Sequence, residues 1–189
     1  MEKLFQYQNL KNFVFSLFNK IGCTEEESEG ISEVLIEADL RGIPSHGLIR
    51  TGLYIGLWEK GRITMNPILT KIHETPSTAT LDAGNGFGIL GARKAMKLAI
   101  EKAKIFGTGW VSVNNSNHFG IAGYYAMMAL EENMIGITTT NASTLVAPTW
   151  STSRFLGTNP IAVAIPAGKN PPFIADFAIV SPSIHERSQ

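Results

Sequence analysis

The spacing of apolar residues changes near Pro67, and this change limits the possible folds more than any other feature of the chain. Before it, apolar residues recur at helical spacing, as in the stretch from Leu10 to Phe18. After it, short strand-like runs alternate with helical stretches, which is typical of a parallel or mixed sheet covered by helices. We therefore expect an α/β protein with a helical region at 1–66 and part of an α/β domain at 67–178.

Local signals place the helices. Thr24 and Glu27 form a capping-box pattern at the start of a helix that runs toward Gly42. A further helix is expected from about Leu48 to Glu59. Two more are expected at 88–106 and 122–132.

Strand signals follow the change near Pro67. Apolar and polar residues alternate in 68–74 and again in 77–82, on either side of Pro76, and this pattern predicts a hairpin. Further strands are expected at 109–113, 135–140, 161–165 and 173–175. The last residues, 179–189, have neither periodicity, and we expect an unstructured end there.

Composition excludes several classes of protein. Sixteen basic and sixteen acidic residues cancel, so the chain lacks the charge excess that binds nucleic acid or anionic lipid. The single cysteine, Cys23, cannot form an internal disulfide, and the N-terminus has no apolar run long enough for a signal peptide or a membrane span. We expect a cytoplasmic protein that binds a small neutral or anionic ligand.

The run Gly86-Phe87-Gly88-Ile89-Leu90-Gly91 lies where a dinucleotide-binding turn would lie, between a strand and a helix. The next strand, however, ends in Ser112-Val113-Asn114-Asn115, without the acid that would bind a ribose. The preceding strand is also expected to belong to a hairpin and not to start a βαβ unit. We interpret the glycines as allowing a tight turn and close helix packing, with a phosphate cradle as the alternative.

His46 lies at a predicted junction between two elements. If a helix begins near Gly47, then His46, Arg50 and Tyr54 share one helical face. A guanidinium can bind a carboxylate, an imidazole a carbonyl or hydroxyl, and a phenol an outer hydrogen-bonding group. This set suits a 2-oxo or 2-hydroxy acid, although His46 could also be an ordinary surface or core histidine.

His118 follows a buried strand and lies next to Asn115, Ser116 and Asn117. This is the edge at which α/β sheets usually bind ligands, and an imidazole there can act as a general acid. The alternative is a loop or capping histidine. No cluster with metal-ligand spacing and no Gly-x-Ser-x-Gly elbow occurs, so we expect neither a metal site nor a serine hydrolase.

Four blocks together carry a family resemblance: residues 38–47 with Arg50, 82–91, 114–126, and 157–160 with Pro166. With these blocks the chain resembles the malate/L-lactate dehydrogenase family of nicotinamide oxidoreductases, which includes ureidoglycolate and sulfolactate dehydrogenases and diketogulonate reductases. The resemblance covers essentially residues 1–178. It implies a nicotinamide-binding fold that is not of the Rossmann type.

The resemblance also implies roles for particular residues. His46 and His118 would lie at the active site, and one of them would transfer the proton. Arg50 would bind the substrate carboxylate, with Ser45 and Tyr54 nearby. The remaining implied contacts are to the cofactor, NAD or NADP: Asn141 and Ser143 at the nicotinamide, and Asp176 along the dinucleotide.

The implied activity is hydride transfer between nicotinamide and a 2-oxo or 2-hydroxy acid, in a homodimer. Residues 179–189 do not continue the family pattern, so we expect a truncated or frameshifted product, incomplete at its C-terminus. Such a product would expose apolar surface and tend to associate. Two alternatives stay open: an inactive remnant that only self-associates, and a binding module for an anionic metabolite that needs no cofactor.

Overall fold

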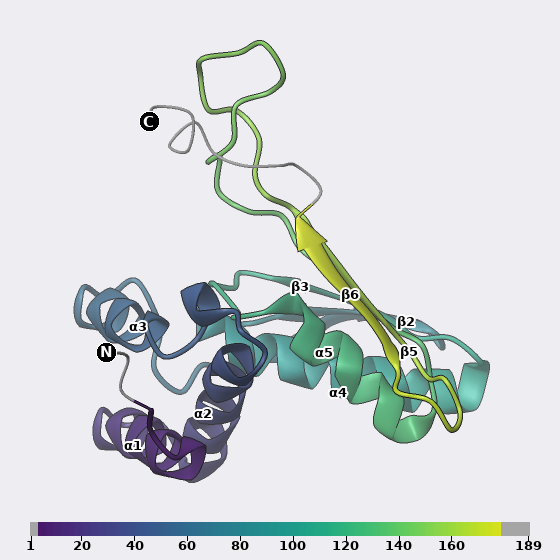
Figure 1. The fold of residues 1–189 in the computed structure, drawn as a ribbon. Coiled ribbons are helices and arrows are strands. Elements are labelled where there is room, and N and C mark those ends of the chain that lie inside the picture. Colours follow the sequence, from purple (N-terminus) through teal and green to yellow (C-terminus); the bar gives the residue numbers. More distant parts are fainter. Residues whose placement is uncertain (1–3, 179–189) are drawn as a thin grey trace. The chain divides into compact units, whose positions relative to one another are not determined.

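The computed structural model describes residues 4–178, which form two compact units (Figure 1). The first ends at Tyr124 and the second begins at Tyr125. The expected unstructured end, 179–189, lies outside the described residues. Whether residues 1–66 form a domain of their own stays a prediction.

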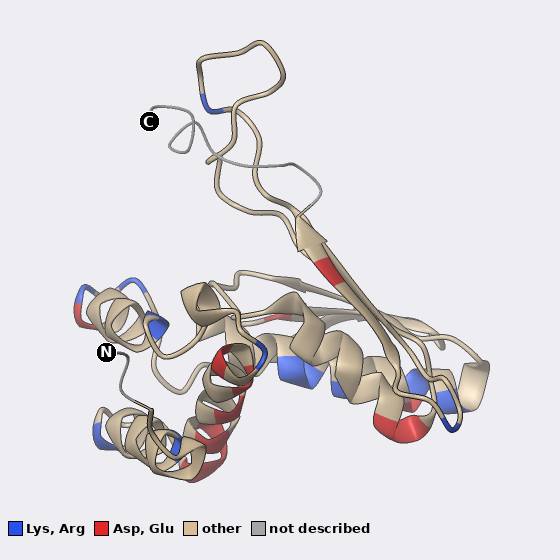
Figure 2. Cartoon of the chain, viewed as in Figure 1, with Lys and Arg blue, Asp and Glu red and all other residues tan. Residues whose placement is uncertain are grey.

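The helices of the first unit follow the sequence signals closely. The capping box is confirmed, since the amide of Glu27 donates to Oγ1 of Thr24 at 3.2 Å and the amide of Thr24 donates to Oε2 of Glu27 at 2.9 Å. Acidic residues follow along the helix that it starts (Figure 2), and those of the first turn suit the positive end of the helix dipole. The elements are α1 (Tyr7–Lys20), α2 (Glu25–Leu40), the 3₁₀ helix η1 (Pro44–His46), α3 (Arg50–Glu59) and α4 (Gly88–Phe106).

One apolar cluster joins these helices. Val14 and Phe18 of α1 pack with Ile31 and Leu35 of α2, and all four are fully buried. The ring of Phe18 meets Phe87 edge to face, with ring centroids 5.5 Å apart. Burial of each large apolar side chain contributes about 1.5–3 kcal/mol. The helical periodicity of the sequence therefore marks the buried faces only in part, since Val14 and Phe18 are buried but Phe13, which has the same spacing, is 59% exposed.

The first sheet has the order β1-β2-β3, with β1 (Thr70–Glu74), β2 (Thr78–Asp82) and β3 (Trp110–Asn114). β1 and β2 form the expected antiparallel hairpin, while β2 and β3 run parallel and are connected through α4. The expectation that the hairpin strand starts no βαβ unit was wrong. A central strand has two edges, and β2 uses one for the hairpin and the other for β3.

The glycines that precede and begin α4 serve close packing, as interpreted from the sequence. A Cβ on Gly86 would overlap the Pro67 side chain, and a Cβ on Gly88 would overlap the backbone of Asn117. Protein atoms thus fill the space beside both α-carbons. The turn holds α4 against the loop that carries His118.

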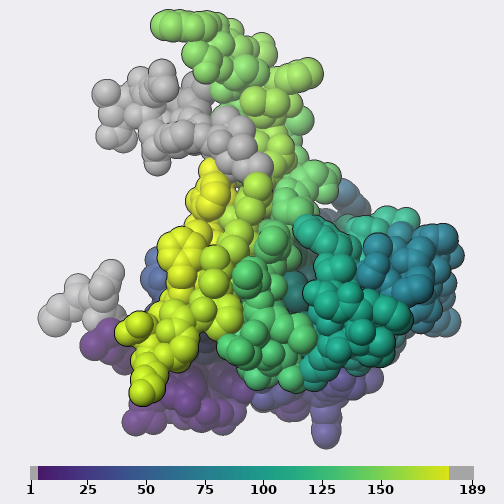
Figure 3. Space-filling model, turned by 90° about the vertical axis from the view of Figure 1, so that its right-hand side faces the viewer, coloured from purple at the N-terminus to yellow at the C-terminus, as the bar shows by residue number. Residues whose placement is uncertain are grey.

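The second unit contains an antiparallel sheet of order β4-β5-β6, formed by β4 (Gly136–Thr139), β5 (Pro160–Ile165) and β6 (Phe173–Ala178). β5 and β6 lie side by side at its surface (yellow in Figure 3). Before them come α5 (Ala122–Met128), which begins in the first unit, and η2 (Ala129–Glu132). The α/β class with N-terminal helices is confirmed, but the strands on either side of α5 belong to two sheets instead of one.

Large apolar side chains are exposed in both units. In the first unit Ile68 is 81% exposed and Ile105 75%; in the second, Trp150 is 99% exposed and Phe155 73%. The association expected from them stays a prediction. Among residues 4–178, no helix is long and apolar enough to cross a membrane.

Two glycine substitutions test the packing of α4. Gly88→Ala should lower the free energy of unfolding by about 1–3 kcal/mol, because its Cβ would overlap the backbone of Asn117. Gly56→Ala is the matched control, since no atom lies within 4 Å of its Cβ position in α3, and it should stabilise by up to about 1 kcal/mol. Urea unfolding followed by circular dichroism measures both. Equal effects of the two substitutions would contradict the close contact.

Candidate active site

The two histidines singled out in the sequence lie together in the first unit. Their rings are stacked, with centroids 5.3 Å apart and planes inclined by 29°. His46 ends η1, and His118 lies in the loop between β3 and α5. Two segments far apart in the sequence therefore place their imidazoles at one site.

Tyr54 and the amide of Gly120 together fix the orientation and tautomer of His118. The Tyr54 hydroxyl lies 2.7 Å from Nδ1 of His118, and the amide of Gly120 donates to the same nitrogen at 3.2 Å. An amide N–H can only donate, so Nδ1 is an acceptor. In the neutral ring the proton is therefore on Nε2, which is left to donate to a ligand.

The surroundings keep His118 neutral at ordinary pH. Partial burial lowers its pKa to about 4, and the positive charge of Arg50 and the neighbouring His46 act in the same direction. The residue still keeps exposed surface, so a ligand can reach it. Tyr54 is 1% exposed, and burial raises its pKa, so its hydroxyl remains a donor.

Ser45, His46 and Arg50 form a connected group beside this pair. Ser45 Oγ lies 2.9 Å from Nδ1 of His46, and Nε of Arg50 donates to the Ser45 carbonyl at 2.6 Å. Within the described part of the chain, no hydrogen bond or ion pair engages the terminal nitrogens of Arg50. A guanidinium held by Nε in this way can offer its terminal nitrogens to a carboxylate.

The sequence predicted this group for a partly wrong reason. α3 begins at Arg50 and not near Gly47, so His46 is not on its face. Arg50 and Tyr54 do lie one turn apart on α3. His46 joins them because Arg50 bonds back to the carbonyl of Ser45.

Asp39 is a residue of the site region to which the sequence assigned no role. Its Oδ2 accepts the amide hydrogen of Leu48 at 2.7 Å, and its carboxylate lies against Gly47. Only its place in the block at residues 38–47, a few residues before His46, could have drawn attention to it, since a lone acid at a helix end has no periodic signal.

The residues expected to bind the cofactor belong to the second unit. Asn141 and Ser143 are exposed in the segment after β4, and Asp176 is exposed on β6. The segment is shaped by Asn159, whose Oδ1 accepts the amide hydrogen of Ala142 at 3.0 Å. The roles of Asn141, Ser143 and Asp176 stay predictions.

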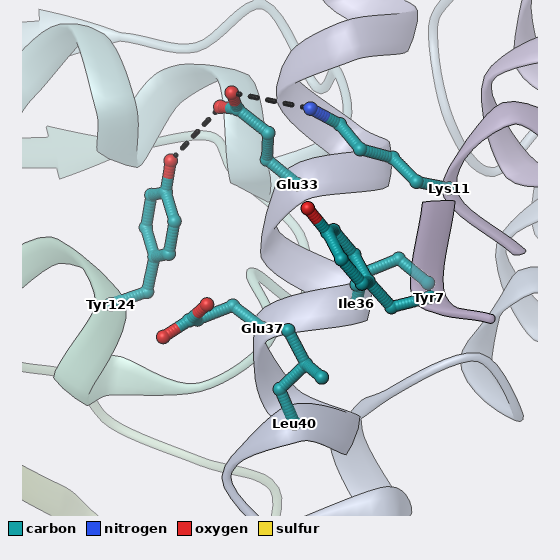
Figure 4. A pocket seen from close by; sticks show the side chains of 7 residues that line it. All are labelled: Tyr7, Lys11, Glu33, Ile36, Glu37, Leu40 and Tyr124. Carbon is teal, nitrogen blue, oxygen red and sulfur yellow. Dashed lines mark hydrogen bonds and ion pairs between the residues drawn. The ribbon is translucent and has the colours of Figure 1, made fainter. Parts of the chain in front are cut away.

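Among the described residues, neither a metal cluster nor the pocket on α1 and α2 provides another site for an anionic substrate. Among residues 4–178, no group of three His, Cys, Asp or Glu side chains could hold a metal ion. A pocket of about 250 Å³ is lined by residues of α1 and α2 together with Tyr124 of α5, and neither His46 nor His118 lines it (Figure 4). Its Glu33 is already paired with Lys11 and Arg93, so the pocket offers no free charge for an anionic substrate. The residues that line it are Tyr7, Lys11, Glu33, Ile36, Glu37, Leu40 and Tyr124.

Comparison with known proteins identifies the family. The family described as malate/L-lactate dehydrogenase matches residues 5–183, which is nearly the whole chain. The chain belongs to the malate/L-lactate dehydrogenase family. The resemblance seen in the sequence is thereby confirmed.

Individual members of the family agree with this assignment. A malate dehydrogenase of Pyrococcus abyssi is 52% identical over 89% of this chain and 46% of its own length. An L-sulfolactate dehydrogenase of Methanocaldococcus jannaschii is 41% identical over 92% of this chain and 50% of its own. The solved malate dehydrogenase of Pyrococcus horikoshii OT3 superposes with a TM-score of 0.91 at 44% identity, over 95% of this chain and 51% of its own. The chain spans about half the length of the curated relatives it matches.

The pKa of His118 can be measured directly. In an NMR titration its ring should titrate near pH 4, and Arg50→Gln should raise this pKa without restoring the ordinary value, because burial remains. Arg62→Gln is the matched control, since Arg62 is not among the groups that lower this pKa. An ordinary pKa in the unsubstituted protein would contradict the described surroundings of the ring.

The same pKa predicts how stability depends on pH. The unfolded chain protonates His118 below about pH 6.5, whereas the folded chain does so only near pH 4. Between these values the unfolded state binds more protons, so the free energy of unfolding should fall as the pH falls. His118→Gln should reduce this loss in denaturant titrations at pH 4.5 and 7, whereas His73→Gln, which changes an exposed histidine of β1, should not. An identical loss in both variants would contradict the prediction.

Proposed function

We propose that the chain is an NAD(P)-dependent oxidoreductase that transfers a hydride between nicotinamide and a 2-oxo or 2-hydroxy acid. The observation that carries the proposal is the stacked pair His46 and His118, held by Tyr54 and flanked by Arg50. Relatives named malate and L-sulfolactate dehydrogenases support the substrate class. The choice among acids of this class stays open.

Arg50 is the proposed anchor for the substrate carboxylate. Its Nε is fixed by the Ser45 carbonyl at 2.6 Å, which aligns the guanidinium before a ligand arrives. Two parallel hydrogen bonds from the terminal nitrogens would set the orientation of the acid. The carboxylate would also offset the positive charge of Arg50.

His118 is the proposed proton donor in the direction of reduction, with His46 stacked beside it. A bound carboxylate offsets the charge of Arg50, so the pKa of His118 should rise and its ring should take up a proton. C2 of the 2-oxo acid would receive hydride from a bound nicotinamide, and the carbonyl oxygen would take the Nε2 proton of the imidazolium. The products would be the 2-hydroxy acid and neutral His118 with its remaining proton on Nδ1, where the hydroxyl oxygen of Tyr54 can accept a hydrogen bond from it; oxidation would reverse these steps.

The family resemblance implies NAD or NADP, and a bound nicotinamide would supply or accept the hydride. The amide of Asn141 and the hydroxyl of Ser143 are suited to hydrogen bonding with a carboxamide, and we propose that contact for them. Asp176 is proposed to bind another part of the dinucleotide. Gly86 and Gly88 are unsuitable for the phosphates, because protein atoms pack against both.

Two other functions are favoured by particular observations. Arg50 and the histidine pair lie within one unit, so they could bind an anionic metabolite without a cofactor. The exposed Trp150 and Phe155 favour a chain that mainly self-associates, including the homodimer implied by the resemblance. The two experiments below distinguish these functions from the proposed one.

Turnover is tested by the loss of NADH or NADPH absorbance with a panel of 2-oxo acids. At least one acid should be reduced, and His118→Ala should lower kcat/KM by about 10²–10⁴-fold, the usual contribution of general acid catalysis. His73→Ala is the matched control and should retain full activity, since His73 is exposed on β1. Full activity of His118→Ala would contradict the role of His118 as proton donor. No turnover with any acid would contradict the proposed activity for this chain.

Binding is tested without turnover by titrating oxamate, an unreactive analogue of pyruvate, and following His118 by NMR. Oxamate should raise the pKa of His118, because its carboxylate offsets the charge of Arg50. Arg50→Gln should abolish this effect. Binding that leaves the pKa of His118 unchanged would place the acid elsewhere, whereas a raised pKa without turnover would favour the binding module.

A further inference from the structure

We propose that Asp39 is the positioning residue of the histidine pair, because it fixes the turn that brings His46 onto His118. The inference rests on the proposed function only in treating the pair as the reactive site. Asp39 itself contacts backbone and not a substrate. It would therefore act by positioning His46 and would not contact the reacting groups.

The first observation is the contact between Asp39 and the turn after His46. Oδ2 of Asp39 accepts the amide hydrogen of Leu48 at 2.7 Å, a hydrogen bond to a charged group. The same carboxylate fills the space where a Cβ of residue 47 would lie, so only glycine fits there. The contact thus needs an acceptor oxygen at position 39 and the absence of a Cβ at position 47.

The second observation is that α2 also holds the segment that carries His118. Gly120 lies so close to Val34 that an added Cβ would come within 2.7 Å of the valine side chain. The hydroxyl of Tyr124 donates to Glu33 of α2 at 3.2 Å, and Nη1 of Arg93 donates to that hydroxyl at 2.6 Å. One helix therefore contacts both segments that carry the imidazoles, and Asp39 is its contact to the segment of His46.

The third observation concerns the place of Asp39 within α2. It lies in the last turn, where the helix dipole is negative and a carboxylate is unfavourable. A residue that opposes the dipole needs another reason to be there. The hydrogen bond to Leu48 and the fit against Gly47 supply that reason.

The test follows the geometry of the pair and needs no enzymatic activity. In NMR spectra, the nuclear Overhauser effects between the rings of His46 and His118 report the stacking, and hydrogen exchange of the Leu48 amide reports the contact. Asp39→Ala should abolish the ring-to-ring signals and speed exchange of the Leu48 amide at least tenfold. Asp39→Asn keeps an acceptor oxygen and should retain both. Glu37→Ala is the matched control, because it removes another acid of the same helix end that pairs with Arg41 instead.

A second variant covers the case in which Asp39→Ala does not fold. Gly47→Ala leaves Asp39 in place but pushes its carboxylate away, so it should also abolish the ring-to-ring signals while the circular dichroism of the helices persists. The proposal is overturned if a folded Asp39→Ala or Gly47→Ala variant keeps the stacked rings. It is also overturned if Glu37→Ala separates the rings equally. A chain without turnover would still give these signals, so failure of the proposed activity is seen separately.

Discussion

The hydrogen bond between Tyr54 and His118 links the site to the core. It joins residues 64 positions apart, and the tyrosine is almost fully buried beside Phe87. A buried hydroxyl without a partner costs about 1–3 kcal/mol, so the packing of α3 favours the one position of His118 that satisfies it. The amide of Gly120, which donates to Nδ1 of the same ring, places the ring proton on Nε2. Core packing, ring orientation and tautomer are therefore set together.

The two units provide different parts of the proposed chemistry. The first contains the imidazole pair and Arg50, which are the groups needed to bind an acid and move a proton. The second contains the residues proposed to contact the nicotinamide. The chain spans about half the length of the curated relatives it matches, so what the described residues support most directly is the part of the site that meets the acid.

Local structure was predictable where the signal is local. The Thr24 and Glu27 capping box and the boundaries of α4 follow from residues a few positions apart. The sheet order was not predictable in this way, because the pairing of β2 with both β1 and β3 depends on long-range contacts. The same limit explains why one continuous sheet was expected where two are present.

In the candidate site, too, local spacing was predictable from the sequence and long-range contacts were not. Spacing alone brought Arg50 and Tyr54 together, since they lie one helical turn apart on α3. The stacking of His46 on His118 could not be derived, because it depends on how two distant loops pack against α2. The part played by Asp39 was missed for the same reason. Its partners are the backbone amide of Leu48 and the space beside Gly47, which has no side chain, and neither leaves a periodic pattern in the sequence.

A crystal structure of the chain with oxamate would test the central claim most directly. The account predicts that the oxamate carboxylate pairs with the guanidinium of Arg50 and that its carbonyl oxygen lies within hydrogen-bonding distance of Nε2 of His118, with the ring of His46 still stacked on it. Oxamate bound away from both residues, or two histidine rings that do not meet, would contradict the account.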